Sequence, residues 1–278
     1  MYKLKGQIRF SECDTSKRIT LPGIINYFQD CSSAQSEQIG HGIDYLKEKK
    51  KAWILSAWQI IVERYPELGE AIEAGTWATD FKGLYATRNF SMKTKSGEML
   101  AYANSIWVFM DLAAGRPTKP GKEEVEAYGM EPALEMEYAP RKIKLSEKAI
   151  LVDTFPVRKY HIDTNNHVNN CQYVQMAMEV LREDMRIRQV RVEYKKSAVY
   201  GDVILPKIAE ETSRTVVELC DMEERPYAVV EFVGDEKINV RLGKKQVLTI
   251  VKKVEFGVYL GSDEDRVLLP KMTGSGRG

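Results

Sequence analysis

The sequence predicts an α+β fold in which antiparallel strands surround buried helices, arranged as two similar halves followed by a short β-rich extension. Runs rich in β-branched and aromatic residues, typical of strands, recur in both halves. A helix with apolar residues on several faces is expected after Asn170, and such a helix is enclosed by other elements. A segment beginning at Asp14 resembles one beginning at Asp163, 149 residues later, which indicates an internal repeat.

The composition limits the kind of protein this can be. A chain of 278 residues allows one large or two modest domains, and a formal net charge of +1 argues against general polyanion binding. The four cysteines are scattered without a C-x-x-C pair, so we expect free thiols, no metal site and no disulfide framework. With no apolar signal core at the N-terminus and no apolar run of membrane-spanning length, we expect a cytoplasmic protein.

The first half, residues 1–138, is predicted to start with a strand at 7–10 and a helix that begins at Leu21-Pro22-Gly23. The apolar residues of this helix have helical spacing: Ile24, Tyr27, Phe28 and Cys31. Strands are predicted at 53–62, 77–85, 88–95 and 99–109, with Ser96-Gly97 as a hairpin turn. The large aromatic residues of these strands belong either to the core or to a pocket wall: Trp53, Trp58, Trp77, Trp107 and Phe109.

A proline-rich, charged segment at 116–143 is predicted to connect the halves. The second half, residues 144–233, contains enough predicted strand to close around one helix. These strands are expected at 155–161, 189–197, 202–211, 215–221 and 228–233.

Residues 161–173, H-I-D-T-N-N-H-V-N-N-C-Q-Y, are dense in Asp, Asn and His. Such short polar side chains bond to nearby backbone, so they favour turns and helix caps over regular structure. Apolar residues at helical spacing follow them, with others on further faces: Cys171, Val174, Met176, Ala177, Met178, Val180 and Leu181. A polar cluster is therefore expected at the N-terminus of a buried helix.

This cluster contains the side chains that acyl transfer needs. A helix N-terminus offers unpaired N–H groups and partial positive charge, so we expect the N–H groups of Val168 and Asn169 to form an oxyanion hole. Asp163 would act as base or nucleophile, Asn165 would orient it or a water, and His167 would carry a proton or balance charge. The alternative is that the Asn residues only cap the helix and the Asp and His residues form a satisfied turn.

The run from Asp163 to Asn170, with Tyr173, resembles the D-x-N-x-H-V-N-N-x-x-Y signature of the acyl-ACP thioesterases. Segments of the first half are similar to that family's N-terminal segments: 53–56, 64–66, 76–77 and 103–111. The resemblance covers about residues 2–233, and it implies that the first half, residues 1–138, forms the wall of the acyl pocket. It implies tandem hot-dog domains, in which an antiparallel sheet wraps around a central helix, and hydrolysis of fatty acyl thioesters carried by acyl carrier protein without a cofactor.

Two sequence differences bear on the mechanism, one between the two copies of the repeat and one between this chain and the plant members of the family. The first copy keeps Asp14 but has Ser16 and Arg18 where the second has Asn165 and His167, so one active site per chain is expected. Plant members have E-Y-R-R-E-C after the helix, and residues 193–198 here read E-Y-K-K-S-A. Ala198 excludes a cysteine nucleophile at this position, and Ser197, in place of the Glu, is a candidate weak hydrogen-bonding support.

The extension at 237–270 resembles the opening part of the RNA-binding OB repeat of a large ribosomal protein. An OB barrel needs five strands, and about three are predicted here. We therefore favour a hairpin that packs on the second domain or on another chain, and consider nucleic-acid binding the weaker interpretation.

Several alternatives stay open at this point. An acyl-CoA thioesterase, a hot-dog dehydratase and a non-enzymatic lipid- or RNA-binding module would share parts of the pattern. Four arginines after the second helix either compensate its C-terminus or dock the acidic carrier protein: Arg182, Arg186, Arg188 and Arg191. The sequence leaves open the acyl chain length, the choice between nucleophile and base for Asp163, and whether two chains form a homodimer.

Overall fold

The computed structural model describes residues 1–181, 185–211, 214–236, 250–261 and 266–271. They fall into two compact units. The larger comprises residues 1–181 and 187–233, and the smaller comprises 182–186 and 234–278.

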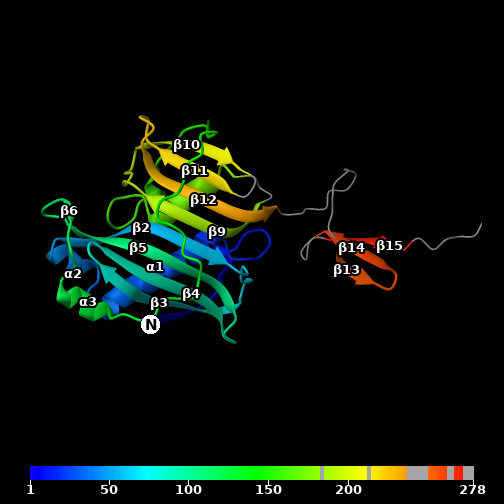
Figure 1. Cartoon of the computed structure of the whole chain (residues 1–278), viewed down its shortest axis with the longest axis horizontal. Helices are drawn as coiled ribbons and strands as arrows, with labels where there is room; N and C mark the ends of the chain where they lie inside the picture. Colours follow the sequence, from blue (N-terminus) through cyan, green and yellow to red (C-terminus); the bar gives the residue numbers. More distant parts are fainter. Residues whose placement is uncertain (182–184, 212–213, 237–249, 262–265, 272–278) are drawn as a thin grey trace, which may run out of the picture. The chain divides into compact units, whose positions relative to one another are not determined.

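The described part of the larger unit is built on one long sheet of mostly antiparallel pairs, in the order β1-β3-β4-β5-β2-β9-β12-β11-β10-β7 (Figure 1). The first half supplies β1 (Tyr2–Gln7), β2 (Lys51–Val62), β3 (Ala71–Lys82), β4 (Tyr85–Thr94) and β5 (Met99–Asp111). The second half supplies β7 (Ile150–Leu151), β9 (Met185–Tyr194), β10 (Val203–Glu210), β11 (Thr215–Cys220) and β12 (Pro226–Glu236). Two short strands pair beside this path, β6 (Arg116–Pro117) with β5 and β8 (Phe155–Pro156) with β10.

The two halves join where β2 pairs with β9. The register runs from Ala57 opposite Glu193 to Ile61 opposite Gln189, with antiparallel strands. This pairing continues the sheet of one half directly into that of the other, so both halves share one backbone scaffold.

The long helix of the first half is α1 (Leu21–Gln38). It begins where predicted, because Thr20 Oγ1 accepts the Gly23 N–H at 3.1 Å and Pro22 occupies the first turn. Its predicted apolar positions are buried: Ile24, Tyr27, Phe28 and Cys31. The ring of Phe28 lies 5.3 Å from that of Phe90 on β4, which places this face of the helix in the core of the first half.

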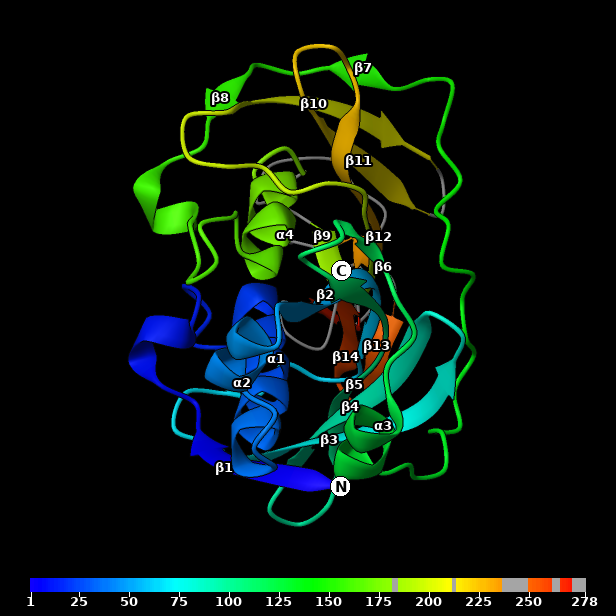
Figure 2. The ribbon, with the colours of Figure 1, turned by 90° about the vertical axis from the view of Figure 1, so that its left-hand side faces the viewer.

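In the second half the equivalent helix is α4 (Asn170–Met178), capped by Asn169, whose Oδ1 accepts the Cys171 N–H at 2.9 Å. It is buried on several sides, as predicted, through Cys171, Tyr173, Val174, Met176 and Ala177. Its N-terminus meets α1, since Cys171 Sγ donates to the Pro22 carbonyl at 3.4 Å and Gln29 Nε2 donates to Asn169 Oδ1 at 3.3 Å. Figure 2 shows α4 above α1 beside the shared sheet.

Two predicted strands are wrong. The segment at 7–10 leaves β1 at Gln7 and forms a 3₁₀ turn (Phe10–Glu12), and the segment at 155–161 contains only β8 followed by a 3₁₀ turn (Lys159–His161). In each turn a side chain bonds back to the preceding backbone. Glu12 Oε2 accepts the Arg9 N–H at 2.8 Å, and His161 Nδ1 accepts the Arg158 N–H at 2.9 Å. Such local bonds replace the ladder that a strand would need.

Other connections contain more structure than predicted. The hairpin turn at Ser96-Gly97 is confirmed, with Gly97 at φ 93° and its N–H bonded to the Thr94 carbonyl at 3.0 Å. A short helix, α2 (Ile43–Glu48), lies between α1 and β2 in the chain. The predicted linker contains α3 (Lys122–Tyr128), which ends at Gly129 with φ 64°. Among the described residues no helix combines the length and apolarity needed to cross a bilayer.

The described part of the extension forms a small antiparallel sheet of its own, β13 (Ile250–Val254), β14 (Gly257–Gly261) and β15 (Arg266–Pro270) (Figure 1). Gly257 is required where β14 meets β15, because a Cβ there would lie 2.3 Å from the Leu269 carbonyl oxygen. The predicted strand pattern at 242–249 lies outside the described residues.

Candidate active site

The predicted polar cluster folds as a tight turn before α4. Asp163 Oδ1 accepts the N–H groups of Asn165 at 2.7 Å and His167 at 3.3 Å, and the Asp163 N–H donates to the His167 carbonyl at 2.8 Å. Asn166 takes the left-handed conformation, φ 61°, which Asn tolerates better than most residues. The turn fixes Asp163 through Oδ1, and within the described part of the chain Oδ2 has no hydrogen-bond partner.

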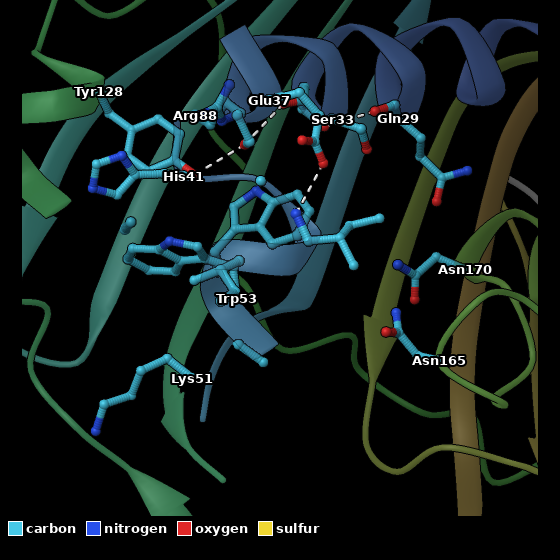
Figure 3. A pocket seen from close by; sticks show the side chains of 18 of the residues that line it. Gln29, Ser33, Glu37, His41, Lys51, Trp53, Arg88, Tyr128, Asn165 and Asn170 are labelled. Atoms are coloured by element: carbon cyan, nitrogen blue, oxygen red, sulfur yellow. Dashed lines mark hydrogen bonds between the residues drawn. The ribbon is translucent and has the colours of Figure 1, made fainter. Parts of the chain in front are cut away.

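The turn lines a cavity of about 590 Å³ between the halves. From the second half come Asp163, Thr164, Asn165, Asn169 and Asn170. From α1 comes a polar face, Asn26, Gln29, Asp30, Ser33 and Glu37. Figure 3 shows Asn165 and Asn170 at one side of the cavity, with Gln29 of α1 close to Asn170.

The N–H groups predicted to form the oxyanion hole are not available in this arrangement. The Val168 N–H donates to the Ala198 carbonyl and the Asn169 N–H to the His161 carbonyl, each at 2.9 Å. The first N–H groups of a helix have no partner within the helix, so an unpaired donor can also lie just after these two residues. Here it is the N–H of Asn170, which has no hydrogen bond to any described residue and belongs to a residue that lines the cavity.

Side-chain amides add further donors. Within the described residues, the amide groups of Asn165 and Asn170 make no hydrogen bond, and both residues line the cavity. Because an amide supplies two N–H donors and one acceptor, this end of the cavity can bind a carbonyl oxygen and a water at the same time.

His167 and Ser197 lie outside this arrangement. Both are exposed, and neither lines the cavity. The support expected from Ser197 comes instead from its neighbour, since the Ala198 N–H donates to the Tyr173 hydroxyl at 2.7 Å while the Ala198 carbonyl holds Val168. Burial raises the pKa of Tyr173 to about 12, so this hydroxyl stays protonated and serves as a fixed anchor.

Cys171 follows the cavity residue Asn170 in the chain, but its thiol is a poor candidate nucleophile. Cys171 is buried directly behind Asn170, and burial raises the pKa of its thiol to about 12. A thiol that stays protonated at neutral pH is a poor nucleophile.

The inner end of the cavity lies in the first half, and the sequence did not predict that Arg88 belongs to it. Arg88 of β4 is buried there, and its Nη1 donates to Gln35 Oε1 at 2.5 Å and to Thr76 Oγ1 at 3.1 Å. Burial lowers the pKa of Arg88 to about 10. Of the aromatic residues considered for the pocket wall, Trp53 and Trp107 line the cavity. The other three, Trp58, Trp77 and Phe109, are buried, belong to the core and do not line it.

Comparison with known proteins identifies the family. The model of the acyl-ACP thioesterase N-terminal domain matches residues 1–128, and that of the C-terminal domain matches residues 144–238. The chain belongs to the acyl-ACP thioesterase family. An S1 domain model matches residues 242–274, in agreement with the OB-like resemblance of the extension.

Among curated relatives, a chloroplastic palmitoyl-acyl carrier protein thioesterase of Arabidopsis thaliana is 23% identical over 240 residues, which cover 80% of this chain and 56% of that protein. The chloroplastic oleoyl-acyl carrier protein thioesterase 1 of the same plant is 24% identical over 225 residues, which cover 73% of this chain and 62% of that protein. The chain thus spans little more than half the length of these relatives.

Solved structures confirm the tandem hot-dog fold. An acyl-ACP thioesterase from Bacteroides thetaiotaomicron superposes with a TM-score of 0.77 at 22% identity, covering 84% of this chain and 97% of that one. A 12:0-ACP thioesterase from Umbellularia californica gives a TM-score of 0.76 at 20% identity, covering 85% of this chain and 97% of that one.

Proposed function

We propose that the chain hydrolyses fatty acyl thioesters of acyl carrier protein, releasing free fatty acid and carrier. The observation that carries this proposal is Asp163, which the turn fixes through one carboxylate oxygen while the other accepts no hydrogen bond from a described residue; Asp163 and Asn170 both line the cavity. The names of the family and of its curated relatives supply the substrate class.

The geometry suits attack on a thioester carbonyl. The Asn170 N–H and the Asn165 amide would hold the carbonyl oxygen as it becomes negative. Asp163 Oδ2 would remove a proton from water, the water oxygen would bond to the acyl carbon, the C–S bond would break, and the leaving thiolate would take up a proton. Alternatively Oδ2 would attack first and form an anhydride that water then hydrolyses.

A single-turnover reaction in ¹⁸O-water identifies the nucleophile route when the label appears in Asp163. With Asp163 as base, the fatty acid carries the label after one turnover. With Asp163 as nucleophile and water attacking the aspartyl carbonyl, the first turnover places the label in the Asp163 carboxylate, where mass spectrometry of the peptide detects it.

The four arginines considered for carrier docking are engaged elsewhere or lie outside the described residues. The helix ends at Met178, so Arg186, Arg188 and Arg191 lie on β9 and do not compensate its C-terminus. Arg191 binds Glu231 Oε1 at 2.7 Å, and Arg188 Nη1 donates to the Glu63 carbonyl at 2.8 Å. Arg182 is outside the described part of the chain. We place the reaction in the cytoplasm and as part of fatty acid biosynthesis.

The decisive experiment measures free-acid release from a chain-length series of acyl-ACP and of the matching acyl-CoA thioesters. We expect turnover of acyl-ACP by the native protein and a loss of about 10²–10⁴-fold in Asp163→Ala. Because His167 is exposed and does not line the cavity, His167→Ala should lose less. Turnover of acyl-CoA alone would keep the site and change the substrate, whereas absence of turnover with both would overturn the proposal.

A further inference from the structure

The cavity has an open end and a buried end. The open end is at Asn165, which is exposed, and the buried end is at Arg88 and His41, each 8% exposed. Helix α1 runs between them. Gln29 lies near the open end and Ser36 near the buried end, roughly 10 Å apart at the rise of an α-helix. Figure 3 shows Tyr128, His41 and Arg88 on the side opposite Asn165 and Asn170.

Tyr128 is placed at this buried end by α3. No residue of α3 is fully buried, but Tyr128, the last residue of the helix, lines the cavity. Its hydroxyl lies 2.9 Å from Ser36 Oγ on α1, and the guanidinium carbon of Arg88 lies 5.2 Å from its ring centroid. Burial raises the pKa of Tyr128, so the hydroxyl remains neutral.

The ring is also in contact with other aromatic residues. Trp53 meets it edge-on at 6.3 Å between ring centroids, and Phe81 lies at 6.5 Å. Together with these residues, the tyrosine ring presents apolar surface at the buried end of the cavity. The neighbouring side chain there is Arg88, whose Nε and Nη2 have no hydrogen bond to any described residue. Contact with such a guanidinium would be unfavourable for the apolar end of an acyl chain, whereas contact with an aromatic face would be favourable.

We propose that Tyr128 is the floor of the acyl pocket and sets the length of the acyl chain that the protein accepts. This inference rests on the proposed function. The carbonyl end of the substrate would lie at Asp163 and Asn170, the chain would pass along the apolar side of the cavity, which includes Trp53 and Trp107, and its methyl end would stop at the Tyr128 ring. The ring would act twice, by limiting depth and by covering the cation of Arg88.

Trp53 and Trp107 are weaker candidates for this role. Trp53 packs on Phe109 with 4.6 Å between ring centroids, and Trp107 Nε1 donates to Ser105 Oγ at 2.7 Å. Both rings belong to central strands of the sheet, so changing either would disturb the scaffold. Tyr128 comes from a short surface helix and can vary while the sheet stays the same.

The test compares three variants over a chain-length series of acyl-ACP. Tyr128→Leu shortens the side chain and removes the ring. Tyr128→Phe keeps the ring and loses the bond to Ser36. Val125→Ala is the matched control, because Val125 lies on the same helix, is half-buried and does not line the cavity.

For Tyr128→Leu we expect the preferred acyl chain to lengthen, with kcat/KM for longer chains rising relative to shorter ones by about fourfold per additional methylene buried. Tyr128→Phe should retain the native preference, since the ring sets the depth. Val125→Ala should also retain it. Thermal melts identify any variant that fails to fold, and Tyr128→Met, which is more pliable and also lacks the ring, then replaces Tyr128→Leu.

The outcomes separate this inference from the proposed function. Hydrolysis with an unchanged chain-length profile in a folded Tyr128→Leu or Tyr128→Met overturns the role of Tyr128 and leaves the function intact. If the native protein hydrolyses no thioester, the function fails, and displacement of a fluorescent fatty acid by a fatty-acid series reports the depth of the pocket directly. Identical binding profiles for the native protein and the ring-less variant would again overturn the inference.

Discussion

The chain contains the same turn twice, once without the cavity and once beside it. In the first half Asp14 Oδ1 accepts the N–H groups of Ser16 at 2.8 Å and Arg18 at 3.3 Å, and the Asp14 N–H donates to the Arg18 carbonyl at 2.8 Å. The Asp163 turn has the corresponding distances 2.7, 3.3 and 2.8 Å. Each turn is followed by a capped helix. The hydrogen bonds of Asp163 are therefore those of a structural turn.

What distinguishes the second turn is the residue two positions on. Ser16 Oγ donates to Asp14 Oδ1 at 2.6 Å, which satisfies its own hydroxyl. The Asn165 side chain makes no such bond within the described residues and lines the cavity together with Asp163, whereas Asp14 does not line it. Among the described residues, the same turn geometry is therefore combined with an unbonded amide and a cavity only in the second half.

The sharpest test of this comparison exchanges each Asp for Asn, which preserves the acceptor oxygen of the turn and removes the charge. We expect Asp163→Asn to lose about 10²–10⁴-fold in kcat. Asp14→Asn should change kcat by less than about twofold, as for a surface substitution. Rates of acyl-ACP hydrolysis and melting curves for both variants measure this. Equal losses of kcat would mean that each aspartate affects activity only by stabilising the fold.

The second prediction concerns the unpaired amide. Asn165→Ser converts the second turn toward the first, because a hydroxyl there would bond to Asp163 as Ser16 does to Asp14. We expect kcat to fall by about 10²-fold, the cost of one oxyanion donor, with little change in the free energy of unfolding. Retention of kcat would remove Asn165 from the proposed site.

The third prediction concerns His167 and its counterpart Arg18, whose Nη2 lies 4.0 Å from Glu67 Oε1. His167 is exposed and does not line the cavity, so His167→Ala should reduce kcat by less than about tenfold. A loss as large as that of Asp163→Asn would show that His167 reaches the substrate in the complex. Steady-state kinetics on acyl-ACP decides between these outcomes.

The smallest expected effect is on stability and comes from the 3₁₀ turns that precede the two aspartates. Glu12 and His161 occupy equivalent places, each accepting an arginine N–H. Burial, assisted by Arg158, lowers the pKa of His161 below its ordinary value of 6.5, so folding favours the neutral ring. This contribution is complete above the ordinary pKa and is lost as the pH falls through the lower folded value.

Urea unfolding at about pH 7.5 and about pH 5.5, on either side of an ordinary histidine pKa, measures this effect. The native protein should lose stability on acidification, and His161→Gln, which keeps an acceptor but does not titrate, should lose less. Equal losses in the two proteins would assign the pH dependence to other groups.

The sequence predicts elements well where the periodicity is local. The start of α1 follows from Leu21-Pro22-Gly23 and that of α4 from the Asn-rich turn, each with apolar spacing behind it. The two strands predicted wrongly fail because Glu12 and His161 bond back to the chain, an interaction that no hydrophobic period reveals. The oxyanion donors at Val168 and Asn169 fail for a related reason, since their bonds to residues 198 and 161 form only in the folded chain.

The polar side of the first-half wall was not predicted, because it is assembled from segments far apart in the sequence; Trp53 and Trp107 of the same wall were among the predicted candidates. Its one local signal is polar residues on a helix that is otherwise apolar, at Asn26, Asp30, Ser33 and Glu37. That spacing places them on one face, which is also what an ordinary solvated face would show. Arg88 and Tyr128 carry no signal, because only tertiary packing brings β4 and α3 together at the inner end of the cavity.

The pairing of β2 with β9 has a consequence for solubility. A separate half would expose β2 or β9 as an open edge, together with the now buried Ile60 or Val190 of that strand. Open edges tend to pair with other chains. With the halves joined, the strands left at the ends of the sheet are β1, which carries Lys3 and Lys5, and β7, which has two residues. Charged and very short strands resist such pairing, so the fused sheet is protected from aggregation at both ends.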